Sequence, residues 1–107
     1  MSGSGGGGGG YIPPQSSKFD CDLTIITTTV SSIDVVVLSK HKVGDILEVA
    51  LSEKESLILE DGDGEILGSI VHINTSDIIE CMKKGADYKA EIIYINFPAC
   101  RVQIKRK

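Results

Sequence analysis

The chain has 107 residues, of which 15 are acidic and 11 are basic, and its formal net charge is −4. A chain of this length forms one small domain at most, which excludes a two-domain enzyme with a cleft between its domains. The acidic balance also lacks the overall attraction to phosphate that is typical of a dedicated nucleic-acid binder.

The N-terminal part differs in composition from the rest of the chain. Seven of the first ten residues are glycine, so we expect residues 1–19 to be disordered alone and residues 20–107 to form the domain. Tyr11, Ile12, Pro13 and Pro14 then form a short extended peptide that is suited to recognition by a protein partner. The alternative is a solubilising tail whose aromatic residues pack onto the domain.

The residues from Asp20 onward favour strands. Isoleucine, valine and threonine fill 27 of these 88 positions, and β-branched residues are typical of sheets. We predict a first strand over residues 23–30 and a clearer one over residues 45–51, followed by a polar loop. Residues 33–38 are either a second short strand or a buried connection, because periodicity does not distinguish the two.

A tight hairpin is the strongest local prediction. Residues 57–60 and 65–71 flank the sequence Asp-Gly-Asp-Gly, in which Gly62 and Gly64 supply the positive φ angles that such a turn requires. Gly68 lies within the second arm and has no side chain to pack. It predicts a bulge, a sharp bend or a close backbone crossing.

One helix is predicted over residues 76–84. Residues 74–76 provide side-chain oxygens for the N-cap, and Lys83 and Lys84 place positive charge near the C-terminal end. Gly85 fits the C′ position that follows a helix.

A second hairpin is predicted from residues 88–97 and 100–105. In its second arm Cys100, Val102 and Ile104 alternate with polar residues, which is the period of a half-buried strand. The expected fold is therefore mainly β, with five or six short antiparallel strands and one α-helix. A small SH3-like or OB-like curled sheet or barrel closes the edges of such a sheet best.

Three segments resemble a known family in their order and spacing: residues 44–49 (GDILEV), 61–70 (DGDGEILGSI) and 76–93 (SDIIECMKKGADYKAEII). Together, residues 44–93 are similar to the second half of HIRAN domains. These are small SH3-like barrels of DNA-repair helicases, and in the best-known case they hold a single-stranded DNA end. The resemblance implies an SH3-like barrel and the binding of single-stranded nucleic-acid ends.

The whole chain also looks like a group of small bacterial proteins in which a glycine run precedes Tyr-x-Pro-Pro, Asp-Cys and a barrel-like domain. In this chain the pattern occupies residues 5–14 and then Asp20 and Cys21. No biochemical activity is attached to that group, so the resemblance implies a bacterial accessory protein of unknown function.

The cysteines give little indication of chemistry. Cys21, Cys81 and Cys100 are odd in number, and no pair has the spacing of a zinc site. Because free cysteine is often buried, we expect three small core residues in a reduced, cytoplasmic protein. The N-terminus agrees with that location, since it has neither the basic region nor the apolar stretch of a secretory signal. A reactive or metal-ligating role for a cysteine stays open.

Neither histidine is linked to a cysteine by a local catalytic signature. We expect His41 to lie in a solvated turn with Lys40 and Lys42, and His72 to end a strand. No catalytic residue and no cofactor are therefore predicted, with a cysteine-dependent enzyme as the alternative.

A metal site is considered at the hairpin turn, where Asp61, Asp63 and Glu65 are spaced like the start of a calcium loop. The pattern fails at its sixth position, which is Ile66, and at its twelfth, which is His72. We therefore predict a plain hairpin turn and no metal.

Charge is unevenly distributed along the chain. Residues 45–65 contain eight acids and one base, whereas residues 101–107 contain four bases and no acid. Arg101 and Lys105 share one face of the last strand, and Lys89 falls on the neighbouring strand, so a basic stripe is expected. It would protect a solvated edge strand, bind an acidic protein surface or bind nucleic acid.

These observations favour a non-catalytic protein-protein interaction module of a bacterial complex, with the peptide at residues 11–14 as a possible docking element. Self-association by strand addition is a further expectation. The alternative function is a HIRAN-like binder of single-stranded nucleic-acid ends.

Overall fold

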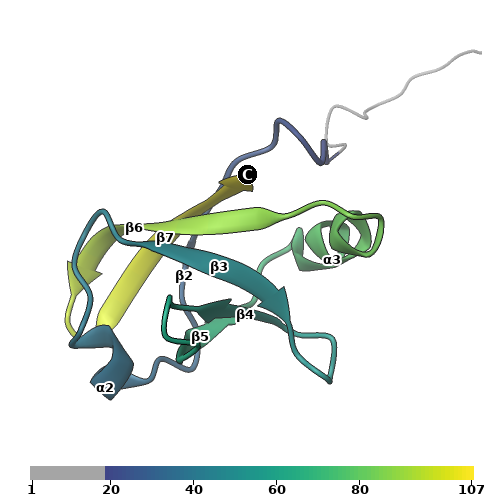
Figure 1. The fold of residues 1–107 in the computed structure, drawn as a ribbon. Coiled ribbons are helices and arrows are strands. Elements are labelled where there is room, and N and C mark those ends of the chain that lie inside the picture. The colour runs from purple at the N-terminus through teal and green to yellow at the C-terminus, as the bar shows by residue number, and fades with distance from the viewer. Residues whose placement is uncertain (1–18) are drawn as a thin grey trace, which may run out of the picture.

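The computed structural model describes residues 19–107. Within these residues there are six strands and two helices: β2 (Ile26–Thr29), α2 (Val35–Leu38), β3 (Ile46–Leu51), β4 (Leu57–Glu60), β5 (Ile66–Ile70), α3 (Thr75–Lys83), β6 (Tyr88–Asn96) and β7 (Ala99–Arg106). The strands form one antiparallel, curled sheet in the order β2-β7-β6-β3-β4-β5, with α2 and α3 on opposite sides of the view in Figure 1. The predicted mainly β, barrel-like fold is confirmed.

One face of the curled sheet carries the core. Cys100, Val102 and Ile104 are buried on β7, as the alternation in the sequence predicts, while Arg101 between them is exposed. Helix α3 adds Ile78 to this core. A helix of nine residues does not stand alone in water, so packing against the sheet stabilises it.

The first hairpin turn is held by one carboxylate. Oδ1 of Asp61 accepts hydrogen bonds of 2.9 Å from the backbone N–H groups of Asp63 and Glu65. Gly64 has a φ of +80°, whereas Gly62 does not adopt a positive φ. The predicted turn is confirmed, but only one of its two glycines needs the left-handed conformation.

Gly68 lies where the two ends of the sheet meet. A Cβ atom there would lie 2.6 Å from the carbonyl oxygen of Ser31 and 2.6 Å from Cγ1 of Val30. Ser31 and Ser69 form an isolated antiparallel bridge, with both N–H to C=O distances at 2.8 Å. The predicted close backbone crossing is therefore confirmed, and it brings the segment that follows β2 against β5.

Residues 33–38 do not form a strand. Their last four residues form α2, and Asp34 caps it by accepting hydrogen bonds from the backbone N–H groups of Val36 at 3.0 Å and Val37 at 3.2 Å. Of the two predicted alternatives the strand is wrong: the segment is a connection, half-buried through Val37 and Leu38, and it contains a short helix. A capping carboxylate outweighs the strand preference of three consecutive valines.

Helix α3 begins one residue earlier than predicted and ends one residue earlier. Asn74 is its N-cap residue, but the Asn74 side chain donates to Asp77 rather than accepting from the backbone. Gly85 follows the helix with a φ of +105°, as its predicted C′ role requires.

The last strand of the sequence is not an edge of the sheet. β7 lies between β2 and β6, so the interpretation of its basic residues as protection of an edge strand is wrong. Strand β2 pairs with β7 on the side opposite to β6, so β2 takes the edge position. That pairing joins segments more than 70 residues apart and leaves no local signal.

The predicted burial in the core is correct for Cys81 and Cys100, but the predicted reduced state is wrong for Cys21 and Cys81. Cys100 is free and buried, whereas Cys21 and Cys81 form a disulfide bond with a Cα to Cα distance of 5.8 Å. They are 60 positions apart, so only the fold brings them together. Within residues 19–107, no helix is long and apolar enough to cross a membrane.

Candidate functional site

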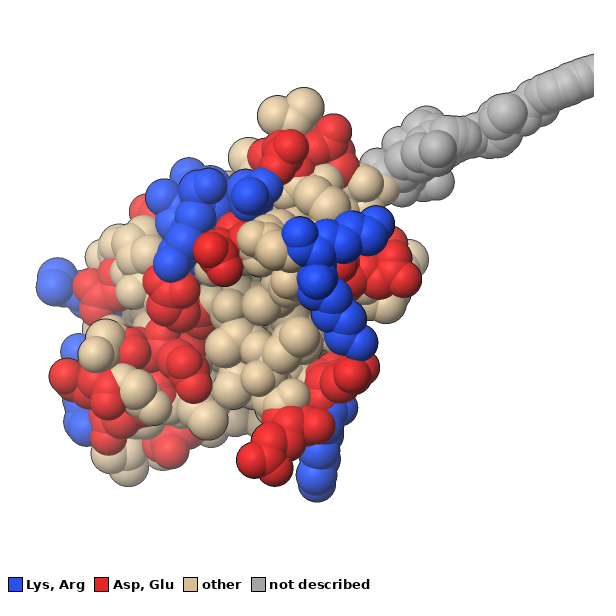
Figure 2. All heavy atoms as spheres, turned by 45° about the vertical axis from the view of Figure 1, so that its right-hand side comes forward, with Lys and Arg blue, Asp and Glu red and all other residues tan. Residues whose placement is uncertain are grey.

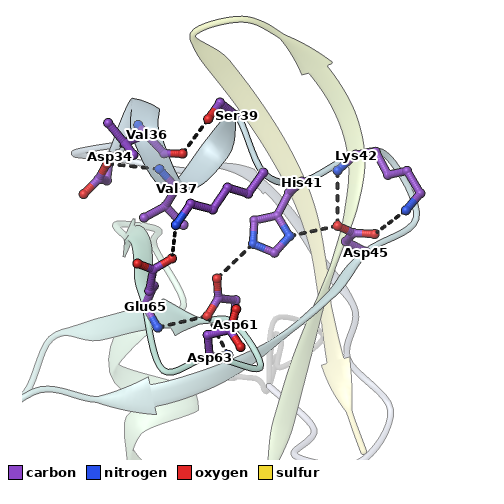
Figure 3. Close-up of polar contacts among 11 residues, drawn as sticks. Asp34, Val36, Val37, Ser39, His41, Lys42, Asp45, Asp61, Asp63 and Glu65 are labelled. Atoms are coloured by element: carbon purple, nitrogen blue, oxygen red, sulfur yellow. Dashed lines mark hydrogen bonds and ion pairs between the residues drawn. The ribbon is translucent and has the colours of Figure 1, made fainter.

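A largely buried histidine, His41, joins three parts of the fold. Nδ1 of His41 lies 2.8 Å from Oδ2 of Asp45, and Nε2 lies 3.1 Å from Oδ2 of Asp61, as Figure 3 shows. The side chain of His41 is 14% exposed and that of Asp61 is 5% exposed. The prediction of a solvated turn is wrong for His41, because the hairpin between β4 and β5 packs over it.

The two carboxylates favour the charged imidazolium. Burial is the largest influence on the pKa of His41 and lowers it, but hydrogen bonds and charge from Asp45 and Asp61 together raise that pKa above its ordinary value. The hydrogen bond with His41 is the main cause of the lowered pKa of Asp45. The pKa of Asp61 is lowered first by the backbone N–H of Glu65 and then by His41.

Two lysines extend this cluster toward solvent. Nζ of Lys40 lies 2.8 Å from Oε1 of Glu65, and the backbone N–H of Lys42 donates to Asp45 at 3.2 Å (Figure 3). The ion pair of Lys40 is solvated and contributes little stability. The cluster therefore connects the segment after α2 to the start of β3 and to the β4–β5 turn.

The His41 cluster fits a structural role better than a catalytic one. Both ring nitrogens of His41 face carboxylates, and the second oxygen of Asp61 accepts two backbone N–H groups. A general base needs a nitrogen that is free to take a substrate proton. Among residues 19–107, no group of three side chains is placed to hold a metal ion.

The cysteines offer no accessible thiol, and all three lie in the described part of the chain. Cys21 and Cys81 are bonded to each other, and burial raises the pKa of the Cys100 thiol. A nucleophilic cysteine needs a stabilised, reachable thiolate. These contacts disfavour the cysteine-dependent alternative.

The segment before β2 is attached to the sheet beside the disulfide. The O–H of Tyr88 donates to the carbonyl of Cys21 at 2.7 Å, and Arg106 forms an ion pair with Asp22. Oδ1 of Asp20 accepts from the N–H groups of Asp22 at 2.8 Å and Leu23 at 3.0 Å. The predicted docking residues Tyr11, Ile12, Pro13 and Pro14 lie outside the described residues.

The predicted basic stripe lies on the outward face of β6 and β7. Lys89 and Lys105 are directly opposite each other, and Arg101 is opposite Tyr94. Sequence alternation was sufficient to place Arg101 and Lys105 on one face. The pairing with Tyr94 was not predictable, because a register shift after Ile92 changes which residues face each other.

The charged residues continue across the sheet in a single row. Lys89 is opposite Glu48 of β3, and Glu48 is opposite Glu60 of β4. The row across four strands is therefore Lys105, Lys89, Glu48 and Glu60, with two bases beside two acids. Figure 2 shows one face of the molecule, on which groups of basic and acidic side chains border an uncharged area.

Comparison with known proteins adds information on the fold. No family model matches the chain, and no curated protein matches it. A crystal structure of a protein from Lactobacillus plantarum is similar, with a TM-score of 0.65 and 14% sequence identity over 78% of this chain and 95% of that chain. At this identity the similarity shows a shared small, mostly β fold.

Proposed function

We propose that this protein is a non-catalytic interaction module of a bacterial complex. The observation that carries the proposal is the charged row on the outward face of the sheet. Like charges directly opposite each other on neighbouring strands destabilise a sheet, and this row contains the pairs Lys89–Lys105 and Glu48–Glu60. Within the molecule Glu48 already forms an ion pair with Lys107, so the pair Lys89–Lys105 is the part of the row whose cost an acidic partner would compensate.

The basic half of this row has the composition of an interface. Arg101 and the partly exposed Tyr94 lie opposite each other beside the lysines, and arginine and tyrosine are enriched in protein interfaces. An acidic surface of a protein partner suits this half best. The peptide Tyr11–Pro14 remains a second proposed contact.

Capture experiments with the full chain test the proposal. The double substitution Lys89→Glu and Lys105→Glu should abolish capture of the partner from the native host, because it reverses the charge of the basic half. Lys54→Glu is the matched control, since Lys54 is exposed in the loop between β3 and β4. Equal capture by the double variant and the control would overturn the proposal.

The tail needs its own variant. Deletion of residues 1–14 should weaken capture of the same partner if the peptide Tyr11–Pro14 is a docking element. Unchanged capture would remove the tail from the proposal and leave the sheet face as the contact.

A second function, the binding of single-stranded nucleic-acid ends, is favoured by one contact. Tyr94 and Arg101 are opposite each other on neighbouring strands, so an aromatic residue lies beside a basic one. Proteins bind single strands by stacking nucleobases on aromatic side chains and by pairing phosphates with basic side chains. Affinity for single-stranded DNA should then fall steeply with salt and weaken in Arg101→Ala and Lys105→Ala. A flat binding curve at low salt would exclude this function.

The cytoplasmic location expected from the sequence is also a proposal. The Cys21–Cys81 bond argues against it, because structural disulfides are typical of oxidising compartments. Trapping the thiols of freshly lysed native cells decides between the two. Three trapped thiols support the cytoplasm, and one trapped thiol, from Cys100, contradicts it.

A further inference from the structure

One edge of the sheet is open along β2. The backbone N–H of Val30 donates to Cys100 of β7, whereas the N–H of Ser31 donates in the other direction, to Ser69. Backbone groups alternate in direction along an antiparallel strand. The N–H and C=O groups of Ile25, Thr27 and Thr29 therefore point away from β7, and no strand in the described part of the chain pairs with them.

The other end of the sheet is largely covered. β5 receives the bridge from Ser31 at Ser69, and the carbonyl of Leu67 accepts a 2.8 Å hydrogen bond from the N–H of Asp34. The chain between β2 and α2 thus occupies the outer side of β5. Among residues 19–107, the stretch 25–29 is the part of the sheet margin with which no strand pairs.

The strand at this edge has no protecting residue of its own, although Arg101 of β7 donates to Oγ1 of Thr29 at one end of it. Residues 23–33 contain no charged residue and no proline, although natural proteins use both to prevent pairing between edges. Leu23 at its start is 77% exposed, and Ile25 is also exposed. Unpaired backbone groups and the exposed side chains of Leu23 and Ile25 therefore occur together in this segment.

We infer that the free edge of β2 pairs, in antiparallel fashion, with the same edge of a second copy of this chain. The inference goes beyond the proposed function, because it adds a contact with a second copy of the chain to the contact proposed for the outward face. With Thr27 opposite its own counterpart, Ile25 of each copy lies opposite Thr29 of the other. A twofold contact of this kind satisfies the free backbone groups of both copies at once.

Charge does not oppose this pairing. The strand itself is uncharged, so no like charges face each other across the new contact. Of the basic residues on β7, Arg101 reaches β2, where its Nη1 donates to Oγ1 of Thr29 at 3.1 Å. In the proposed register the two Thr29 residues lie four positions apart along the new strand pair, which is roughly 14 Å. That distance exceeds the screening length of about 8 Å at physiological ionic strength, so the repulsion between the two Arg101 side chains is weak.

Sedimentation equilibrium of the full chain tests the inference. The wild type should form dimers as its concentration rises to the millimolar range. Thr27→Lys places a charge at the centre of the edge and should weaken self-association by at least about tenfold. Gln103→Lys is the matched control, because Gln103 is the neighbour of Thr27 in β7 and shares its outward face, and it should dimerise like the wild type.

Hydrogen exchange identifies the contact directly. The amide protons of Ile25, Thr27 and Thr29 should become protected as the protein concentration rises. A wild type that stays monomeric, a Thr27→Lys variant that dimerises normally, or three unprotected amides would each overturn the inference. Loss of capture in the variant with Lys89→Glu and Lys105→Glu concerns the outward face only, so the proposed function and the edge contact fail separately.

Discussion

The phenolic O–H of Tyr88 donates a 2.7 Å hydrogen bond to the backbone carbonyl of Cys21, a residue 67 positions earlier in the chain. Tyr88 is buried at the start of β6, and Cys21 is also bonded to Cys81 in α3. One short segment is thus fixed to a strand by a hydrogen bond and to a helix by a covalent bond. Both attachments lead to predictions.

Removal of the disulfide should lower stability substantially. The bond closes a loop of about 60 residues, and a cross-link of that kind contributes roughly 2–4 kcal/mol to the free energy of unfolding. Urea unfolding of the variant with Cys21→Ser and Cys81→Ser measures the loss. Reductant should lower the midpoint of the wild type and leave that of the variant unchanged, and equal midpoints for the two proteins without reductant would contradict the prediction.

Loss of the tyrosine hydroxyl should have a smaller effect. Tyr88→Phe leaves the carbonyl of Cys21 without its donor, which costs about 1 kcal/mol of unfolding free energy. Thermal or urea unfolding detects this difference. Tyr94→Phe serves as the control, because the Tyr94 side chain lies on the exposed face of β6, and a similar loss in both variants would argue against the hydrogen bond as the cause.

Stability should decline above neutral pH because of His41. The folded-state pKa of His41 is raised above 6.5, so its contribution is complete below about 6.5 and is lost as the pH rises through the folded pKa. Urea unfolding between pH 6 and pH 9 should show this slope in the wild type. His41→Gln should remove most of it, whereas His72→Gln should keep it.

Stability should also decline in acid because of the partners of His41. The pKa values of Asp45 and Asp61 are lowered from 3.8, so their contribution is present above that value and is lost as the pH falls through the folded pKa values. Asp45→Asn should reduce this acid loss in urea unfolding curves. An unchanged acid limb in that variant would show that the carboxylate does not hold His41.

Substitution of Gly68 should be costly. Gly68→Ala places a methyl group 2.6 Å from the carbonyl oxygen of Ser31, and relief of such a clash costs about 1–3 kcal/mol. Gly62→Ala is the matched control within the same hairpin, since its methyl group would meet no described atom within 4 Å. Equal unfolding free energies for the two variants would contradict the close contact at Gly68.

Local signals in the sequence predicted much of the fold. The Asp-Gly turn, the glycine after α3 and the alternation from Cys100 to Ile104 each act over a few residues, and the structure confirms all three. The β-branched content predicted the number of strands, but the first strand is Ile26–Thr29 rather than residues 23–30, because Asp20 holds the residues before it in a turn. The helix α2 was missed because its Asp34 cap competes with a strongly strand-like run of valines.

The candidate site was less predictable, because its contacts join distant segments. His41 meets Asp61 across 20 positions, and Cys21 meets Cys81 across 60. Neither pair has a spacing that marks it in the sequence. The basic residues of β7 were predictable, because alternation alone places them on one face. The acidic residues of β3 and β4 lie in the same row because the sheet has the strand order β7-β6-β3-β4, which the sequence does not indicate.

The cross-link at Cys21 also determines how the molecule would bear a mechanical load. A pull on the chain before Cys21 reaches α3 through one covalent bond to Cys81, and so bypasses the 60-residue path through β2 to β5. The tension would pass into α3, and β2 would bear none of it. A partner that pulls on the glycine-rich N-terminal segment would therefore transmit force to α3 and would place no load on the backbone of residues 25–29.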